Sequence, residues 1–387
     1  MMKVLLITGK FGMGHYSAAA TLAEEIQSAY RDAEVKIFDI YEGAFPGCCQ
    51  MIYSVYSSLV ERGCLLYNLA YKNALKPRQA RPGTLNPQAH PIHGHMLKAL
   101  AQEVESFRPD AVIATYSLCA KLMGEYKKQS GSKVPFVTCI TDVTSHNVWI
   151  NAECDLYLVA AENTRDELVG RGVPAEKIAI SGIPVRQSFK SITGRAKEGG
   201  RGEALSAGSK EAGRYNRELL IMGGGLGLLP EKMEFYQQLN RLPGVRTTVV
   251  TAGNQKLFDK LWGKFSNITV LGYSREVDRL MAEADLLITK PGGITMFEAI
   301  HAEVPLLLFH PFLEQEVKNG KFVGDKGLGM VLAKKPEQSL GEIACLLENP
   351  YLLQVIRKNM RQMKERLDEK ALLRFLDSLG VSEMKVA

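Results

Sequence analysis

Several features that would assign a chain to a membrane-spanning, secreted or zinc-binding class are missing from this sequence. No apolar run approaches the roughly 20 residues that a membrane-spanning helix needs. The N-terminal MMKVLLITGK runs directly into a glycine loop without a cleavage-site pattern, so it predicts a strand and no signal peptide. The seven cysteines are odd in number and lack the spacing of a zinc site, which favours a reduced cytosolic setting over a disulfide framework. We therefore expect a globular protein that is soluble or peripheral to a membrane.

Length and charge set the next limits. With 387 residues and 46% hydrophobic content, the chain is long enough for two domains with well-formed cores. The net charge is +6, and the excess is concentrated between Glu61 and Leu100, where six basic side chains stand against Glu61 alone. The six are Arg62, Lys72, Lys76, Arg78, Arg81 and Lys98. Such a segment suits anionic lipid headgroups or nucleic acid, although a merely solvated basic face has the same composition.

The most informative stretch is Asp285–Asn319, in which strand and helix patterns alternate. It predicts a buried strand over Asp285–Thr289, a helix over Ile294–Ala302 and a strand over Val304–Phe309. The loop between the first two carries paired glycines, which let a ligand approach the backbone, and the helix start offers free N–H groups to an anion. We therefore expect a phosphate there. The residues of this expected site are Lys290, Gly292, Gly293 and Thr295.

Glu298 lies one turn into that helix and has two interpretations. Its carboxylate could accept hydrogen bonds from a diol such as a ribose, with a polar cluster for sugar hydroxyls after the next strand, at the same edge of the sheet. That cluster consists of Glu314, Gln315, Glu316 and Asn319. Alternatively, Thr295 to Glu298 fits a capping box, in which Glu298 only satisfies the N-terminal donors of its own helix. The capping box leaves the polar cluster unexplained.

His15 stands at the mouth of the first predicted strand, Lys3–Thr8, before a helix over Tyr16–Ala29. Gly12 to His15 resembles part of the dinucleotide fingerprint, but Ser17 occupies the third glycine position, so the indication of an NAD site is weak. An imidazole at this edge of the sheet could take a proton from an attacking hydroxyl at neutral pH. A histidine hydrogen-bonded to its own loop is the other interpretation.

Two segments of helical periodicity, Met51–Val60 and Leu65–Ala70, lead into the basic region. Tyrosines are distributed along them, at Tyr53, Tyr56, Tyr67 and Tyr71. An apolar face with tyrosines and nearby lysines is typical of an interfacial membrane element, and equally of an ordinary core-packing helix. Arg78–His95, with three prolines, predicts a loop.

Four segments of the chain resemble one family of enzymes. TKPGGITMFEA followed by PFLEQEVKN is similar to the donor half of the diacylglycerol glycosyltransferases and monogalactosyldiacylglycerol synthases, which are related to the lipid-linked peptidoglycan N-acetylglucosaminyltransferase. Gly12–His15 matches the family's G-x-G-H loop, Asp142–Trp149 resembles its D-x-x-x-H-x-x-W segment, and Gly182–Arg186 matches its G-x-P-x-R. The likeness runs in order through nearly the whole chain.

The resemblance implies an α/β fold of two Rossmann-like domains that face each other across a cleft, the GT-B type of glycosyltransferase. We expect residues 1–190 to bind the acceptor and the membrane and residues 214–365 to bind the nucleotide sugar. The Gly/Ser/Ala-rich residues 191–213 predict a flexible linker or insertion, and residues 366–387 a helix that packs back on the first domain.

The implied activity is the inverting transfer of a hexose from UDP-glucose or UDP-galactose to diacylglycerol, by a cytoplasmic protein peripheral to the inner face of the cell membrane. His15 is the leading general base, and Asp142 orients it, serves as the base itself, or only caps the next helix. No carboxylate pair with D-x-D spacing stands at a plausible strand end. We therefore expect no metal, and assign the stabilisation of the departing diphosphate to Arg186 and the helix after Gly293.

The remaining donor contacts are expected in the second half of the chain. A second glycine loop, Gly223–Gly227, would lie near the phosphates, and the backbone at Gly272 and Tyr273 near the uracil. This loop has no polar side chain where relatives often carry one, which leaves the choice of sugar open. The expected donor-binding residues are Gly14, Arg186, Gly224, Gly225, Asn254, Tyr273, Lys290, Gly292, Gly293, Thr295, Glu298, Gln315, Glu316 and Asn319.

Other functions remain compatible with the sequence. The same architecture hosts UDP-sugar epimerases, and a transferase could act on another lipid-linked acceptor. A non-catalytic protein that binds lipid or nucleic acid through the basic segment is a third possibility. We expect anionic membrane lipids and no nucleic acid as partners.

Overall fold

The computed structural model describes residues 1–11, 13–62, 91–192, 216–311 and 313–380, and divides the chain into two compact units. The first unit comprises Met1–Pro184 and Leu367–Ala387, and the second Val185–Arg366. The division falls ahead of the predicted linker 191–213, which lies outside the described residues except for its first two.

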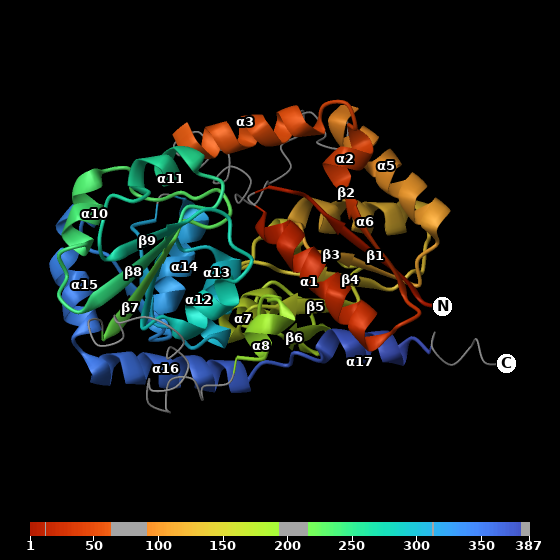
Figure 1. Cartoon of the computed structure of the whole chain (residues 1–387). Helices are drawn as coiled ribbons and strands as arrows, with labels where there is room; N and C mark the ends of the chain where they lie inside the picture. The colour runs from red at the N-terminus through yellow and green to blue at the C-terminus, as the bar shows by residue number, and fades with distance from the viewer. Residues whose placement is uncertain (12, 63–90, 193–215, 312, 381–387) are drawn as a thin grey trace, which may run out of the picture. The chain divides into compact units, whose positions relative to one another are not determined.

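A sheet of six parallel strands forms the centre of the first unit (Figure 1). Its order is β2-β1-β3-β4-β5-β6. The strands are β1 (Lys3–Thr8), β2 (Glu34–Asp39), β3 (Ala111–Ala114), β4 (Phe136–Cys139), β5 (Leu156–Val159) and β6 (Ile178–Ile180). Strands β1, β3, β4 and β5 are almost entirely buried apolar residues, as expected of a parallel sheet covered on both faces.

Helices connect these strands. They are α1 (Gly14–Ala29), α2 (Ile40–Ala44), α3 (Cys49–Arg62), α5 (Pro91–Phe107), α6 (Ser117–Ser130) and α7 (Glu162–Val169), with 3₁₀ turns at Asn147–Trp149 and Ala175–Lys177. The prediction of a loop over Arg78–His95 is wrong at its end, because α5 begins at Pro91. Proline is tolerated in a first helical turn, since the N–H groups there have no acceptor within the helix. The predicted helical segment Leu65–Ala70 lies outside the described residues.

Two hydrophobic clusters cover the two faces of this sheet. One contains α5 and α6 residues such as Leu100 and Leu122, and the other joins α1 to the C-terminal helix α17 (Ala371–Ser378). Leu372 and Leu376 of α17 are buried there with Ile26 of α1. The last helix of the chain therefore completes the core of the first unit.

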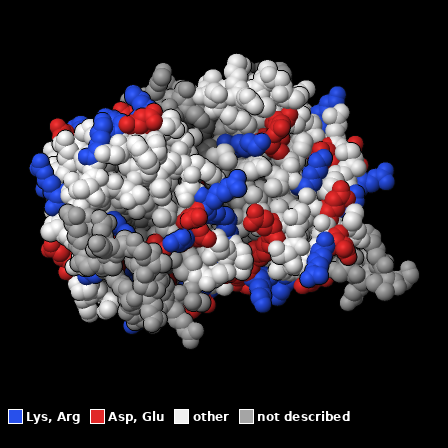
Figure 2. All heavy atoms as spheres, viewed as in Figure 1, with Lys and Arg blue, Asp and Glu red and all other residues white. Residues whose placement is uncertain are grey.

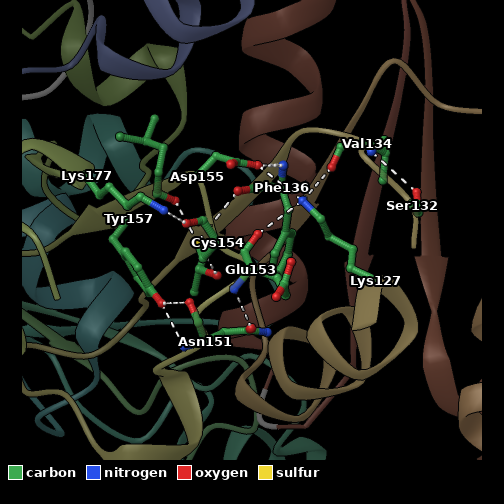
Figure 3. A network of polar contacts seen from close by, with 12 residues as sticks. Lys127, Ser132, Val134, Phe136, Asn151, Glu153, Cys154, Asp155, Tyr157 and Lys177 are labelled. Atoms are coloured by element: carbon green, nitrogen blue, oxygen red, sulfur yellow. Dashed lines mark hydrogen bonds and ion pairs between the residues drawn. The ribbon is translucent and has the colours of Figure 1, made fainter. Parts of the chain in front are cut away.

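A polar network supports the edge of the sheet where β4 and β5 begin (Figure 3). Lys127, only 6% exposed, donates from Nζ to the carbonyl oxygens of Val134 (2.8 Å) and Glu153 (3.1 Å). Its ammonium also lies 3.4 Å from Oδ2 of Asp155, which accepts the Phe136 N–H at 2.8 Å. A buried ammonium costs free energy unless its donors are satisfied, and here three oxygens satisfy them.

The second unit repeats the architecture with a sheet of order β12-β11-β10-β7-β8-β9, again all parallel (Figure 1). Its strands are β7 (Arg217–Met222), β8 (Val245–Val250), β9 (Ile268–Leu271), β10 (Leu286–Thr289), β11 (Leu306–Leu308) and β12 (Gly329–Val331). The predicted fold class of two α/β Rossmann-like domains is confirmed by the two sheets.

The helices of the second unit are α8 (Gln187–Lys190), α10 (Met233–Leu239), α11 (Gln255–Leu261), α12 (Val277–Glu283), α13 (Gly293–His301), α14 (Glu314–Asp325), α15 (Leu340–Leu347) and α16 (Pro350–Glu365), with a 3₁₀ turn at Pro336–Gln338. Helix α16 is fixed beside the end of α13 by Glu303. This carboxylate accepts from Arg361 (2.9 Å) and Lys364 (2.7 Å) and is nearly buried, so all three charges depend on one another.

The distribution of charged side chains can be followed on one face of the molecule. Basic and acidic side chains are interspersed over the face seen in Figure 2. Most of the predicted basic segment falls in residues 63–90, outside the described residues. None of the described helices has the length and apolar content needed to cross a bilayer.

Candidate active site

In both sheets the strand order reverses beside one strand, and ligands bind at the carboxyl ends of the strands at such a position. In the first unit β1 lies between β2 and β3, and in the second unit β7 lies between β8 and β10. The loops after β1 and β3, and those after β7 and β10, are therefore the places in each unit where substrate is expected.

His15 lies in the first turn of α1, and its ring is fixed by two neighbouring strand ends. Nδ1 is 3.0 Å from the carbonyl oxygen of Thr115 and 2.7 Å from Oγ1 of Thr141. The Thr115 hydroxyl lies 2.9 Å from the carbonyl oxygen of His15 and 2.8 Å from Oγ1 of Thr8. The interpretation in which His15 bonds only to its own loop is wrong, because its partners follow β3 and β4.

The hydrogen bonds of His15 determine which ring nitrogen can act as a base. A carbonyl oxygen can only accept, so Nδ1 carries the hydrogen and the lone pair is on Nε2. Burial lowers the pKa of His15 to about 4, against the opposing effect of the hydrogen bond to Thr115. The half-buried imidazole is neutral at physiological pH. Nε2 can therefore accept a proton from a hydroxyl, with less driving force than a histidine of ordinary pKa.

Asp142 directly follows Thr141 and is buried, with 6% of its surface exposed. The next helical turn, Asn147–Trp149, has His146 as its N-cap residue, so Asp142 does not occupy the capping position of that turn. Trp149 is completely buried, and its ring lies 6.4 Å from that of His15. The D-x-x-x-H-x-x-W segment thus forms part of the surroundings of His15. A role of Asp142 as base or orienting group stays a prediction.

Aromatic rings pack around the loop that precedes α1. Phe11 lies edge-on to Tyr41 at 4.7 Å and to Tyr53 at 4.9 Å, between ring centroids. Tyr116 lies 5.8 Å from Phe11 and 5.0 Å from His15. Tyr53 comes from α3, where Met51 and Val55 are 64% and 54% exposed. Among the described side chains of α3, Tyr53 therefore packs against the body of the first unit while Met51 and Val55 are exposed; a contact of this helix with the membrane stays a prediction.

Asp39 ends β2, the position at which dinucleotide-binding folds hold a ribose. Its carboxylate accepts from the Tyr53 hydroxyl at 2.6 and 2.7 Å and from the N–H groups of Tyr41 (2.9 Å) and Glu42 (3.2 Å). These bonds cap α2 and hold α3. Together with Ser17 in the third glycine position, this occupied carboxylate argues against an NAD site.

Two glycine-containing loops meet at the ends of β7 and β10. Because Thr289 pairs with Met222, the loop of Lys290 starts beside Gly223. Gly224 has φ of +69°, and a Cβ built on it would lie 2.9 Å from Cε of Lys290, so the lysine side chain crosses close over this loop. Backbone amides and one ammonium group thus gather where a diphosphate would be expected. Gly225, in the same loop, is exposed.

Helix α13 starts beside these loops. Its N-cap is Gly292 without a side-chain hydrogen bond, and Gly293 is its first residue. The first N–H groups of a helix have no partner within it, so those of Gly293 to Thr295 are available to an anion. The capping-box interpretation of Glu298 is wrong, because a helix that begins at Gly293 places Glu298 in its second turn.

The Glu298 carboxyl has an unusual environment. Burial raises its pKa to about 7; the charge of Arg186 lowers it and that of Asp278 raises it further. Within the described parts of the chain, no residue forms a hydrogen bond or ion pair with this half-buried carboxyl. A desolvated carboxyl without an internal hydrogen bond suits a ligand hydroxyl pair, and such groups gather at functional sites.

The polar cluster after β11 divides into two groups. Asn319 is buried, with 1% of its surface exposed, and Nδ2 donates to the carbonyl oxygen of Pro291 at 2.9 Å. Oε1 of Glu316 lies 3.9 Å from the Lys290 ammonium, and Gln315 lies beside it in the first turn of α14. Asn319 therefore supports the loop after β10, while Glu316 forms an ion pair with Lys290. Their contacts with a sugar stay predictions.

The other predicted donor residues are more dispersed. Asn254 caps α11 through Oδ1 (3.0 Å to the Leu257 N–H) and donates to the Gly227 carbonyl oxygen at 3.1 Å, so it shapes the Gly223–Gly227 loop. Tyr273 is 79% exposed. Arg186 donates to the carbonyl oxygen of Arg275 at 3.3 Å. Gly14 belongs to the first unit, as the first residue of α1, and Gly12 lies outside the described residues.

Comparison with known proteins agrees with this division. The family model for monogalactosyldiacylglycerol (MGDG) synthase matches residues 15–185, and that for the glycosyltransferase family 28 C-terminal domain matches residues 221–369. A processive diacylglycerol beta-glucosyltransferase of Bacillus cereus (strain AH187) is 30% identical over 91% of this chain and 88% of its own. The chain belongs to the diacylglycerol glycosyltransferase family. The enzyme of the same name from Bacillus subtilis (strain 168) is 28% identical over 100% of this chain and 97% of its own.

The fold of this diacylglycerol glycosyltransferase family member is also similar to that of a solved structure. The crystal structure of MurG from Acinetobacter baumannii has a TM-score of 0.61 at 17% identity and covers 98% of this chain and 99% of its own. At that identity the likeness shows the fold alone, which is the GT-B type.

Two residues of the candidate base site escaped the sequence analysis. Thr115 and Thr141 hold His15, yet they are separated from it by 100 and 126 residues. The one available signal was that each follows a short apolar run, at the edge of the sheet where His15 stands.

Proposed function

We propose that this chain transfers glucose from UDP-glucose to diacylglycerol with inversion at the anomeric carbon. The support for glucose is the name of the similar Bacillus enzymes. The donor sugar is joined to the diphosphate in the α configuration, so a single displacement gives a β-linked glycolipid, in keeping with the word "beta" in those names. UDP-galactose is the alternative donor to test.

The observation that carries this proposal is the state of His15. Nε2 holds a lone pair at neutral pH because Nδ1–H donates to the Thr115 carbonyl oxygen. In the proposed step the diacylglycerol hydroxyl oxygen attacks the anomeric carbon, its proton passes to Nε2, and the bond from the anomeric carbon to the diphosphate oxygen breaks. UDP leaves with the electron pair of that bond, and the proton is then lost from His15 to water.

The second unit supplies what the donor needs. Glu298 accepts hydrogen bonds from the ribose hydroxyls. Lys290, Arg186 and the first N–H groups of α13 stabilise the negative charge that develops on the departing diphosphate. These groups do the work that a metal does in other transferases, so we propose that activity survives an excess of chelator. We also propose that the protein acts from the cytoplasm as a peripheral protein on the inner face of the membrane, with the exposed apolar residues of α3 toward lipid.

The test is to incubate the protein with UDP-glucose or UDP-galactose and diacylglycerol in anionic vesicles, and to identify the glycolipid by NMR. The proposal predicts β-glucosyl diacylglycerol, formed equally well with excess chelator. An α-linked product would contradict the single displacement, and a galactosyl product the choice of donor. An altered sugar nucleotide without glycolipid would instead indicate an epimerase.

A further inference from the structure

Helix α3 is joined to the loop before α1 through the side chain of Tyr53. The backbone N–H of Lys10 donates to the Tyr53 hydroxyl at 3.1 Å. That hydroxyl in turn donates to Asp39, whose two oxygens lie 2.6 and 2.7 Å away. The Tyr53 ring packs edge-on against Phe11, at 4.9 Å between centroids. One side chain thus fixes the backbone of one loop residue and the ring of the next.

The loop held in this way is the one that leads to His15. Lys10 and Phe11 precede His15 by five and four residues in the sequence. On the other side of the loop, Nδ1 of His15 is bound to the Thr115 carbonyl oxygen. The loop is therefore fixed at its start by α3 and at its end by the strands, and the position of Nε2 depends on both attachments.

Charge strengthens the attachment at the start of the loop. Asp39 is buried and also caps α2 by accepting the N–H groups of Tyr41 and Glu42. Lys10 adds an ion pair with Glu42 at 3.0 Å. Burial raises the pKa of Tyr53 above its ordinary value, and the hydrogen bond to Asp39 raises it further, so the hydroxyl remains a donor at every physiological pH.

We propose that Tyr53 is a positioning residue for the transfer reaction, which sets the place of the His15 loop through the Lys10 N–H···Tyr53 O–H···Asp39 chain of hydrogen bonds. This inference rests on the proposed function. Displacing a reacting group by about 1 Å lowers the reaction rate by about a hundredfold. Removing the hydroxyl therefore lowers the turnover number while leaving donor affinity unchanged, because Glu298, Lys290 and the start of α13, which hold the donor in the proposed function, lie in the second unit.

The chain offers a matched control in the same unit. The Tyr30 hydroxyl donates to Oδ1 of Asp377 at 2.6 Å and lies 3.1 Å from the Leu373 carbonyl oxygen, so it too joins a helix to a carboxylate. Tyr30 ends α1 and contacts α17, at the opposite end of α1 from His15. Tyr53→Phe and Tyr30→Phe remove the same kind of hydrogen bond, and only the first one touches the loop of His15.

The experiment compares both variants with the wild type in two measurements. The first is kcat and KM for UDP-glucose with diacylglycerol vesicles. We expect Tyr53→Phe to lower kcat by about tenfold to a hundredfold with KM for the donor unchanged, and Tyr30→Phe to change neither. Equal kcat values in Tyr53→Phe and Tyr30→Phe, or a Tyr53→Phe effect confined to KM, would overturn the proposal.

The second measurement is hydrogen–deuterium exchange of the peptide that contains Lys10, without substrate. Tyr53→Phe should speed exchange there, whereas Tyr30→Phe should not. Unchanged exchange in Tyr53→Phe would show that the hydroxyl does not hold the loop and would overturn the proposal even if the wild type proved inactive as a transferase. An inactive wild type with faster exchange in Tyr53→Phe would contradict the proposed function and leave the positioning of the loop supported.

Discussion

Replacing Glu298 by glutamine should weaken donor binding and at the same time stabilise the folded protein. A hydrogen bond to a charged group contributes about 1.5–3 kcal/mol. Glutamine keeps one acceptor oxygen and turns the other into a donor, so about one such bond to the ribose is lost. We therefore expect the dissociation constant for UDP-glucose to rise by about tenfold to a hundredfold, at about 1.4 kcal/mol for each factor of ten.

Stability should change in the opposite direction. The folded protein raises the pKa of Glu298 from the ordinary 4.5 to about 7, chiefly through burial, so ionisation costs free energy in the folded state only. The penalty is absent below pH 4.5, grows between pH 4.5 and about 7, and is fully present above that range. At about 1.36 kcal/mol per pKa unit, with allowance for the partly exposed position, we expect Glu298→Gln to be more stable by about 1–3 kcal/mol at pH 8.

The assay is calorimetric titration with UDP-glucose from pH 6 to 8, together with thermal unfolding at both ends of that range. UDP-glucose is suitable because its diphosphate does not titrate there. Wild-type affinity should rise through pH 7 as Glu298 ionises, and that of Glu298→Gln should stay flat. Glu303→Gln is the matched control, since it should lose stability and keep its donor affinity. A Glu298→Gln variant with unchanged affinity and a lower unfolding temperature would refute the reasoning, because that result belongs to a structural carboxyl.

Three further predictions follow from the site. Because burial lowers the pKa of His15 to about 4, the pH profile of kcat at saturating donor should show no titration with a pKa of about 6–7. A kcat that falls as a group of that pKa is protonated would contradict the lowered pKa of His15. Lys290→Met should raise KM for UDP-glucose by about tenfold to a hundredfold, since a charge about 4 Å from the diphosphate contributes about 1–4 kcal/mol. Replacing the exposed Lys358 by methionine should leave KM unchanged. Equal KM values for the two variants would show that Lys290 is not at the phosphates. Burial opposes the ionisation of Glu303, but hydrogen bonds from Arg361 and Lys364 outweigh it and lower its pKa. The resulting stabilisation of about 1–3 kcal/mol is present above pH 4.5 and lost as the pH falls through the lower folded pKa, so chemical denaturation of wild type and Glu303→Gln should converge at low pH; a constant difference down to pH 3 would be inconsistent with it.

The sequence predicted the two parallel sheets because their strands are short apolar runs bounded by glycine loops. Strand β1 has the predicted bounds, and the loop of Lys290 follows its strand as expected. These features are local, since a buried parallel strand needs apolar residues on both faces wherever it stands in the sheet.

Local sequence patterns could not predict the features that depend on contacts between residues far apart in the sequence. Thr115 and Thr141 reach His15 only through the order of β1, β3 and β4 in the sheet. Asn319, expected toward the sugar, has its amide on the Pro291 carbonyl oxygen, because the carboxyl ends of β10 and β11 bring α14 beneath that loop. The capping box failed for a similar reason: the glycine loop after β10 makes Gly292 the N-cap of α13, three residues before Thr295, where the pattern required it.

The central claim is that His15 serves as the base for transfer from a UDP-sugar to a lipid hydroxyl. The most direct test measures UDP release from UDP-glucose with and without diacylglycerol in anionic vesicles, for the wild type and for His15→Asn, whose amide can still donate to the Thr115 carbonyl oxygen. The account predicts release that requires diacylglycerol and falls by at least about a hundredfold in His15→Asn, with UDP-glucose binding retained. Release without an acceptor, or a variant as active as the wild type, would contradict it.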